Sequence, residues 1–251
     1  MENSDVGIVI LSCDRFSETW GPCIDHFFKA WPSCPFRVYL LNNVVPSLDN
    51  RVNDLLVGID KGWSDSLLKG LSKLKEKRVL FIYDDSFIMD FNLPSLKEVI
   101  DLALRENLDS VALRKRSFDS GKPYNKILYK IDPKAKYRTS LFMNLIKKEV
   151  LVKLLVRSEN AWQFEKEGNK RNVGYDFYSV YEKGLVNYKH GIVKGKWLPD
   201  TYNYLLELGY LSNATLGTHN KSRIYLIKIY SYVFTLFHNI LNNFRLSNPF
   251  K

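Results

Sequence analysis

The chain has 251 residues, of which 45% are hydrophobic and 25% are charged, and its formal net charge is +10 at pH 7. This ordinary globular balance excludes an intrinsically disordered chain, and the length suits one large domain or one domain with a small appendage. No Asp or Glu follows Glu207 and no known nucleic-acid-binding motif is present, so the excess charge is local and argues against a nucleic-acid partner.

The cysteines and the N-terminal segment indicate the cellular compartment of the protein. Cys13, Cys23 and Cys34 lack zinc-binding spacing, and an odd number of cysteines favours reduced thiols in a cytosol. The apolar run at residues 6–11 has no basic region before it and is too short for a signal-peptide core. We therefore expect a cytoplasmic protein, with peripheral attachment to the inner face of the cytoplasmic membrane as an open alternative.

The first third of the chain alternates strand and helix patterns. Apolar runs predict buried strands at residues 6–11, 36–41, 55–59 and 79–83. Helices are expected over residues 16–30, 63–75 and 93–105. Gly21-Pro22 interrupts the first helix early, whereas Asn92 is a suitable N-cap for the third, with Pro94 in its first turn. This order predicts an α/β fold with a Rossmann-type, mostly parallel sheet flanked by helices.

The second half of the chain is less regular. Strand patterns occupy residues 110–113 and 126–131, and helix patterns occupy residues 145–156 and 176–183. No internal repeat, low-complexity tract or long flexible linker interrupts these segments.

The sequence Tyr83-Asp84-Asp85-Ser86 directly follows the strongest predicted strand. Ligand sites of open parallel sheets lie beyond the carboxyl ends of their strands. Two adjacent carboxylates repel each other there and favour a cation, and their hard oxygens suit Mg²⁺ or Mn²⁺. The alternative is an ordinary turn, because Asp and Ser are common turn residues.

Several segments together resemble a known family. A helix begins at Trp63, an apolar strand runs into Asp84-Asp85, and an aromatic residue, Phe87, follows. Further blocks lie at residues 140–149, 160–165 and 189–197. In this order they resemble bacterial GT-A glycosyltransferases of capsule and O-antigen gene clusters, from about residue 6 to about residue 199. The chain departs from the common Asp-x-Asp form, which leaves open which aspartate binds metal.

The resemblance implies a GT-A-like fold and a sugar transferase of surface polysaccharide biosynthesis. Its donor would be a nucleotide-sugar, with a UDP-sugar as the first choice, and its cofactor would be Mn²⁺ or Mg²⁺. The acceptor would be a glycan or a lipid-linked glycan. Transfer that inverts the anomeric centre is the leading hypothesis, and retention stays an open alternative. We expect a catalytic domain at residues 1–205, with a nucleotide-sugar half at 1–110 and an acceptor half at 111–205, and a C-terminal helical extension at 206–251.

Site residues on the donor side follow from the same resemblance. Asp85 would bind the metal, and Asp84 would contact the nucleotide ribose or the metal. Ser12, Cys13 and Asp14, at the tip of the first strand, would face the base and ribose. For Asp14 the alternative is a loop or helix-capping role.

On the acceptor side, Glu165 is the candidate general base that takes the proton of the acceptor hydroxyl, and Trp162 would stack on an acceptor sugar. Alternatively, the aromatic residues of this segment are core and Glu165 is a surface ion-pair partner. Glu159, Glu167 and Asp176 are the rival bases.

A late basic segment completes the expected site. His190 would be a metal ligand, and Lys194 or Lys196 would balance phosphate charge. Gly191 and Gly195 would allow the backbone to approach a ligand closely. A structural, hydrogen-bonding histidine is the alternative for His190.

The C-terminal segment is apolar, and residues 229–244 carry no formal charge. Sixteen residues fall short of the roughly 20 that a membrane-spanning helix needs. With Lys228 and Arg245 at its flanks, the segment fits a helix lying on an anionic membrane surface. Packing against the catalytic domain or against another subunit in an oligomer is the alternative.

Two other functions compete with sugar transfer. A nucleotidyltransferase acting on sugar phosphates also uses paired aspartates, but it would show a glycine-rich basic loop where this chain has Ser12-Cys13-Asp14-Arg15. A non-catalytic, membrane-attached glycan-binding or scaffold protein would show no metal-dependent binding of nucleotides.

Overall fold

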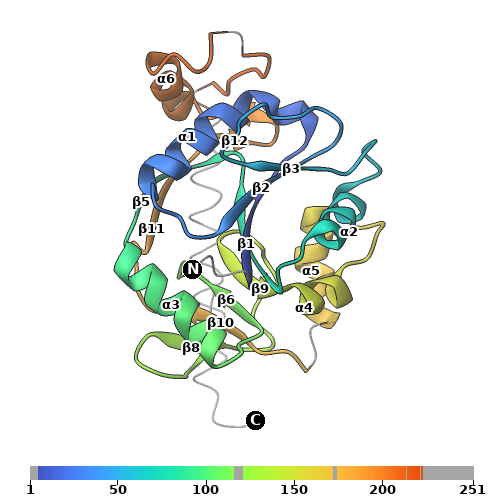
Figure 1. Ribbon diagram of the computed structural model, residues 1–251, viewed down its shortest axis with the longest axis vertical. Helices are drawn as coiled ribbons and strands as arrows, with labels where there is room; N and C mark the ends of the chain where they lie inside the picture. Colours follow the sequence, from blue (N-terminus) through green and yellow to red (C-terminus); the bar gives the residue numbers. More distant parts are fainter. Residues whose placement is uncertain (1–4, 116–120, 172–173, 213, 221, 223–251) are drawn as a thin grey trace.

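The computed structural model describes residues 5–115, 121–171, 174–212, 214–220 and 222 (Figure 1). A nine-stranded sheet runs through the described part of the chain. In spatial order its strands are β3 (Asn53–Leu56), β2 (Arg37–Asn42), β1 (Val6–Leu11), β4 (Arg78–Tyr83), β9 (Asn144–Lys147), β6 (Ser110–Ala112), β10 (Phe177–Val180), β8 (Leu128–Ile131) and β7 (Gly121–Pro123).

The strands of the first third are all parallel. β3, β2, β1 and β4 pair in this way, so that their carboxyl ends share one edge of the sheet. β9 is inserted antiparallel between β4 and β6, and β10 then pairs parallel with β6. The predicted Rossmann-type α/β sheet is confirmed, with a mixed half beyond β4.

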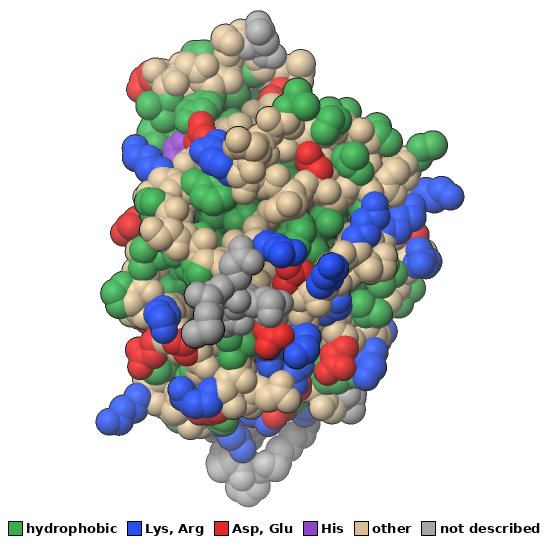
Figure 2. Space-filling model, in the orientation of Figure 1, with side chains coloured by type: hydrophobic (Ala, Val, Ile, Leu, Met, Phe, Trp, Pro, Cys, Tyr) green, Lys and Arg blue, Asp and Glu red, His purple; other side chains and the backbone are tan. Residues whose placement is uncertain are grey.

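Helices cover both faces of the sheet. They are α1 (Trp20–Ala30), which the 3₁₀ helix η1 (Asp14–Thr19) precedes, α2 (Trp63–Lys73), α3 (Leu93–Arg105), α4 (Lys148–Leu154), α5 (Ala161–Arg171) and α6 (Pro199–Glu207). In Figure 1, α1 and α3 lie on one side and α2, α4 and α5 on the other. Figure 2 shows Lys and Arg side chains gathered over the side that carries α2, α4 and α5, so the basic surface is not confined to the C-terminal segment.

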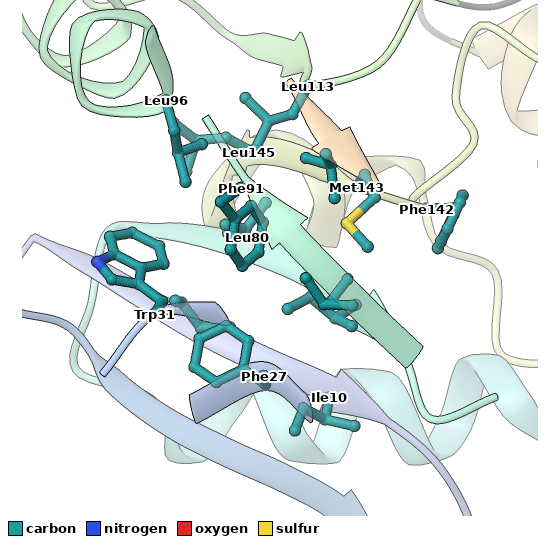
Figure 3. Packing of buried hydrophobic residues seen from close by; sticks show 14 of the residues in the cluster. Ile10, Phe27, Trp31, Leu80, Phe91, Leu96, Leu113, Phe142, Met143 and Leu145 are labelled. Atoms are coloured by element: carbon teal, nitrogen blue, oxygen red, sulfur yellow. The ribbon is translucent and has the colours of Figure 1, made fainter. Parts of the chain in front are cut away.

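Successive side chains of a strand point to opposite faces of the sheet, so the hydrophobic core is divided into two clusters. Ile8 and Ile10 of β1 pack in the cluster that includes α1 and α3, whereas Val9 and Leu11 pack in the cluster that includes α2 and α4. Figure 3 shows the first cluster, in which Phe27 lies beside Ile10 of β1. Because both faces are buried, β1 is a continuous apolar run rather than an alternating one.

One predicted helix begins later than expected, and another is wrong. Residues 145–156 were expected to be helical, but they begin in β9, and the helix α4 starts only at Lys148. Residues 176–183 contain β10 instead of a helix. In both segments, hydrogen bonding to distant strands overrides a local apolar pattern that fits either structure. The helix over residues 93–105 is confirmed, and Asn92 accepts a hydrogen bond from the Ser95 amide at 3.4 Å, as its N-cap role requires.

The smaller deviations lie around the first and third strands. The first predicted helix divides into η1 and α1, and Gly21-Pro22 lies in the first turn of α1 instead of interrupting a helix. The third strand covers Asn53–Leu56 rather than 55–59.

Two small antiparallel pairs lie outside the main sheet. One is the ribbon of β5 (Ser86–Phe91) and β11 (Val186–His190), and the other is the hairpin of β12 (Ile192–Val193) and β13 (Lys196–Trp197). Phe87 and Phe91 of β5 make edge contacts with His26 and Phe27 of α1. The ribbon therefore brings a late part of the chain against the residues that follow β4.

The first part of the expected extension packs on the core. Leu211 and His219 are buried, and His219 Nε2 lies 2.7 Å from the carbonyl oxygen of Val193. Within the part of the chain that is described, no helix is both long and apolar enough to cross a membrane. The apolar stretch from residue 229 onward lies outside the described residues.

Candidate functional site

A cavity of about 280 Å³ opens at the carboxyl edge of β1, β2 and β4. Its wall is completed by η1, by α2 and by Ala161 at the start of α5. The polar lining comes from Ser12, Cys13, Asp60, Ser66, Asp84 and Asp85, and the aromatic lining from Phe16, Trp63 and Tyr83. This position is the one where ligands bind in open parallel sheets.

Asp84 is buried and held from three sides. Its amide donates to the carbonyl of Leu11 at 3.2 Å, which closes the edge between β1 and β4. Its Oδ2 accepts hydrogen bonds from Ser12 Oγ and, at 3.1 Å, from Thr19 Oγ1. Trp20 Nε1 in turn donates to Ser12 Oγ at 2.6 Å. Asp84 is therefore fixed in place, with one carboxylate oxygen engaged by two hydroxyl groups.

Burial is the main cause of the raised pKa values of Asp84 and Asp85. Burial raises the pKa of Asp84 to about 7, and the neighbouring charge of Asp85 adds to the rise, while the hydroxyls of Ser12 and Thr19 oppose it. Burial also raises the pKa of Asp85 to about 6. Two carboxylates with raised pKa values favour a bound cation, which would stabilise their ionised forms.

Asp85 and His190 come together although they are far apart in the sequence. In the β5–β11 ribbon, His190 pairs with Ser86, and the Gly191 amide donates to the Asp85 carbonyl at 2.6 Å. Ser86 Oγ lies 3.4 Å from Asp85 Oδ1 and 3.4 Å from His190 Nδ1. Desolvation of the ring and the charge of Arg114 lower the pKa of His190, which favours the neutral imidazole that a metal requires.

These residues fit a divalent cation as a small donor set. A carboxylate and a neutral imidazole suit Mn²⁺, and the carboxylate also suits Mg²⁺. The described residues hold no cluster of three or more His, Cys, Asp or Glu side chains that could bind a metal without help. Metals of this type are often bound by one or two carboxylates together with substrate phosphates and water, so two protein ligands are compatible with such a site.

The three residues at the tip of the first strand, which are expected to face the base and ribose, have different surroundings. Cys13 lines the cavity. Ser12 lines the cavity and holds Asp84. Asp14 instead accepts hydrogen bonds from the amides of Asn43, Val44 and Val45, at 2.9, 3.0 and 3.2 Å. Its carboxylate thus holds the loop after β2, and the loop-capping alternative describes its contacts.

The acceptor-side candidates lie on α5. Trp162 is 63% exposed beside Ala161 at the cavity wall, and Lys166 Nζ lies 5.8 Å from the centre of its ring. Glu165 is half-buried one turn beyond Ala161, and its carboxylate makes no hydrogen bond or ion pair with any described residue.

The rival bases are engaged elsewhere. Glu159 forms a two-pronged ion pair with Arg171, at 2.7 and 2.5 Å. Asp176 pairs with Lys130 at 2.7 Å, and Glu167 pairs with Lys170 at 2.7 Å.

The late basic segment forms the β12–β13 hairpin. Lys194 and Gly195 make its turn, with φ of 49° and 73°, and Lys194 is exposed. Gly195 lies close to the side chain of Arg15, because a β-carbon added to this glycine would lie 3.9 Å from Arg15 Nη2. The turn therefore lies beside the guanidinium of Arg15, a residue of η1.

The sequence reasoning missed Arg114, which lies close enough to His190 to lower the pKa of that ring. It also missed the contribution of Asp60 to the cavity. Arg114 directly follows a strand that was predicted, so the rule that singled out Asp84-Asp85 could have identified it.

Comparisons with known proteins show the fold. No family model and no curated protein sequence matches the chain. A fragment of S. aureus TarS, residues 1-349, superposes with a TM-score of 0.52 at 12% identity, over 84% of this chain and 66% of that chain. The same fragment in complex with UDP-GlcNAc gives 0.50 at 14% identity, over 84% and 68%. A UDP-glucose pyrophosphorylase in complex with UDP-glucose gives 0.49 at 9% identity, over 72% and 91%.

This chain therefore spans about two thirds of the length of the TarS fragment, at 66%. Identities of 12% and 14% show a shared fold, which is the GT-A-like α/β fold, and no more than that.

The buried aspartate should make stability depend on pH. Because the pKa of Asp84 in the folded protein, about 7, exceeds the ordinary 3.8, the folded state binds more protons than the unfolded state between about pH 4 and pH 7. The free energy of unfolding should then fall as pH rises through this window. Asp84→Asn should remove much of that fall and stabilise the metal-free protein at pH 8 by a few kcal/mol, on the order that such a shift represents.

Chemical denaturation at pH 5 and pH 8 in EDTA measures this effect. Asp60→Asn, a change at an exposed aspartate in the same cavity, is the matched control and should leave the pH dependence as it is. Comparing Asp84→Asn with wild type separates the contribution of Asp84 to the pH dependence from that of His190. The lowered pKa of His190 makes the free energy of unfolding rise with pH, which is the opposite direction. Equal pH dependence in Asp84→Asn and wild type would show that Asp84 is not a buried, strained carboxylate.

The close approach at Gly191 should also be measurable. A β-carbon there would lie 2.6 Å from the Phe87 ring, 2.8 Å from Trp197 and 3.3 Å from the Asp85 carbonyl oxygen. Gly191→Ala should therefore lower the free energy of unfolding by about 1–3 kcal/mol, the usual cost of overpacking. Gly217→Ala, where no atom lies within 4 Å of the added carbon, should change it little. Denaturation curves in which both variants match wild type would refute the close approach.

Proposed function

We propose that this chain is a glycosyltransferase that transfers a sugar from a nucleotide-sugar to a glycan or lipid-linked glycan. The observation that carries the proposal is the pair Asp84-Asp85, with raised pKa values, at the floor of a cavity of about 280 Å³ on the carboxyl edge of the sheet. The shared fold with a TarS fragment that was crystallised with UDP-GlcNAc and with UDP supports a UDP-sugar as the donor.

In this proposal, the cavity holds the nucleotide. Phe16 and Trp63 offer aromatic faces for the base, and Ser12 lies beside the carboxylates for the ribose. Asp85 and His190 would hold Mn²⁺ or Mg²⁺, with Asp84 fixing the floor of the site. The cation, when bound, neutralises negative charge on the departing diphosphate. Lys194, on the hairpin turn near Arg15, would add positive charge at the phosphate side.

Glu165 is proposed as the general base of an inverting transfer. A base must have a free carboxylate within reach of the acceptor hydroxyl. Glu165 has no described partner, whereas Glu159, Glu167 and Asp176 are held in ion pairs. Residues four apart lie on the same face of a helix, so Glu165 follows the cavity residue Ala161 along α5.

The residue that contacts the acceptor, the biosynthetic role and the attachment to a membrane are also proposed. Trp162, largely exposed next to the cavity wall, would stack on an acceptor sugar. A role in surface polysaccharide synthesis, and peripheral attachment to an anionic membrane surface or oligomer formation through residues 226–241, rest on the sequence alone. The loop between β1 and η1 contains no glycine, which disfavours a nucleotidyltransferase.

The metal role predicts that nucleotide binding depends on Asp85. Asp85→Asn should weaken binding of UDP in Mn²⁺ by at least about tenfold, the lower end of the cost of disturbing a metal site. Isothermal titration calorimetry with and without EDTA measures this directly. Asp90→Asn, at an exposed aspartate of β5, is the control and should bind UDP as wild type does. UDP affinity that is unchanged by Asp85→Asn and by EDTA would reject the metal role, and no UDP binding at all would favour the scaffold alternative.

The base role predicts a separate kinetic effect. Glu165→Gln keeps the shape and hydrogen-bonding capacity of the side chain but removes the proton acceptor, so turnover should fall about a hundredfold or more while donor affinity stays the same. Release of UDP from a UDP-sugar in the presence of a lipid-linked glycan acceptor measures turnover. Glu167→Gln, on the same helix but ion-paired, should remain active. Near-normal turnover in Glu165→Gln, with an inactive Asp176→Asn, would assign the base to Asp176.

A further inference from the structure

Arg114 leaves the sheet at the same edge as Asp84 and Asp85. β4 and β6 both pair antiparallel with β9, so these two strands run in the same direction and end at the same edge. Arg114 follows β6 by two residues, as Asp85 follows β4 by two residues. In the strand order β1–β4–β9–β6, the cavity lies on the β1 side of Asp85, and Arg114 lies on the opposite side.

The guanidinium of Arg114 lies over an aromatic side chain. Its Cζ is 4.9 Å from the centre of the Phe142 ring. The Phe142 ring is 4.9 Å from that of Tyr188 and 5.6 Å from that of His190. The ring of Tyr83, at the end of β4, is 5.3 Å from that of Phe142. Arg114, Phe142, Tyr188 and His190 thus form a continuous group, which we call the Arg114 subsite, beside Asp85 and Ser86.

Arg114 has no anionic partner among the described residues. Its Nε is buried and makes no hydrogen bond. By contrast, the guanidinium of Arg78 donates to the Leu108 carbonyl and to Asn107, and that of Arg171 pairs with Glu159. A partly buried cation without a partner is unfavourable unless a ligand supplies the opposite charge.

The position of Arg114 is nevertheless fixed. The Leu113 amide donates to the Met143 carbonyl at 2.8 Å, and Ser179 Oγ donates to the Arg114 carbonyl at 3.2 Å. With its backbone held and its side chain lying on Phe142, Arg114 is already arranged to meet a planar or tetrahedral anion. Arginine binds carboxylate and phosphate through two parallel hydrogen bonds, which lysine cannot do.

We propose that the Arg114 subsite binds an anionic group, a phosphate or a carboxylate, carried by the acceptor. The inference rests on the proposed function and deepens it by naming the acceptor class. The base and ribose of the donor have their own place, because the cavity lies on the β1 side of Asp85. An anion bound on the β6 side of Asp85 is therefore carried by the acceptor, which approaches the donor from that side.

Three small probes that share a glucose-type ring and differ in the group at carbon 6 test the proposal on the intact chain. Glucose 6-phosphate, glucuronate and glucose are titrated calorimetrically, both in the absence and in the presence of saturating UDP and Mn²⁺. The phosphate, the carboxylate or both should bind at least about tenfold more tightly than glucose, as expected for one charge-assisted hydrogen-bonded pair. Binding by only one of the two anions identifies which group the acceptor carries.

Variants then assign the effect to Arg114. Arg114→Gln should abolish the advantage of the anionic sugar, and Arg114→Lys should retain part of it. Arg105→Gln, at an exposed arginine in the last turn of α3, should retain all of it. UDP affinity should stay within about threefold of wild type in each variant, a change below the tenfold step of one lost charged contact. Thermal melting checks that each variant is folded, and Arg114→Lys serves as the test if Arg114→Gln is not.

Three outcomes would overturn the inference. The first is equal binding of glucose and both anions to wild type while UDP still binds, which leaves the proposed function standing. The second is an anion preference that survives in Arg114→Gln. The third is a tenfold loss of UDP affinity in Arg114→Gln with an unchanged anion preference, which would assign Arg114 to the donor. Absence of UDP binding in wild type is distinguishable from all three, since it contradicts the proposed function itself.

Discussion

The site depends on keeping two adjacent carboxylates at the end of a buried strand. Asp84 and Asp85 are desolvated, which raises the pKa of both groups, and the charge of Asp85 adds to the rise at Asp84. The fold offsets this cost with hydroxyls from Ser12 and Thr19, both outside β4. A bound cation would offset it further, and the cavity beside the pair leaves room for a diphosphate to accompany the cation. The same arrangement that strains the ligand-free protein therefore favours a charged ligand.

Three consecutive residues of η1 and α1 connect this pair to the rest of the molecule. Glu18 accepts hydrogen bonds from the loop after α6, Thr19 donates to Asp84, and Trp20 donates to Ser12. Glu18 therefore joins η1 to the loop after α6, whereas Thr19 and Trp20 both reach the hydrogen-bond network around Asp84. On the other side, the β5–β11 ribbon brings His190 to Ser86. The site is thus assembled from the beginning, the middle and the end of the described chain.

The sequence predicts best what is encoded locally. The helix capped by Asn92 and the strand before Asp84 are found where their patterns place them, because caps, apolar runs and strand ends are local signals. A helix pattern also covers β10 and the residues of β9 that precede α4, since only pairing with distant strands distinguishes these strands from helices. The closeness of Asp85 and His190 follows from that same long-range pairing, and the engagement of Asp14 by the loop after β2 depends on a turn that no local pattern reveals.

The central claim is that a nucleoside diphosphate and a divalent cation meet at Asp85 and His190. Paramagnetic broadening by Mn²⁺ tests it most directly, because the effect is short-ranged and reports on both partners at once. With UDP present, substoichiometric Mn²⁺ should broaden the imidazole proton signals of His190 and the phosphorus signals of UDP, while the methyl signals of Ile131, four strands away from β4 and at the opposite edge of the sheet, stay sharp. Broadening of the UDP phosphorus signals without any effect on His190, or UDP binding that Mn²⁺ does not affect, would contradict the account.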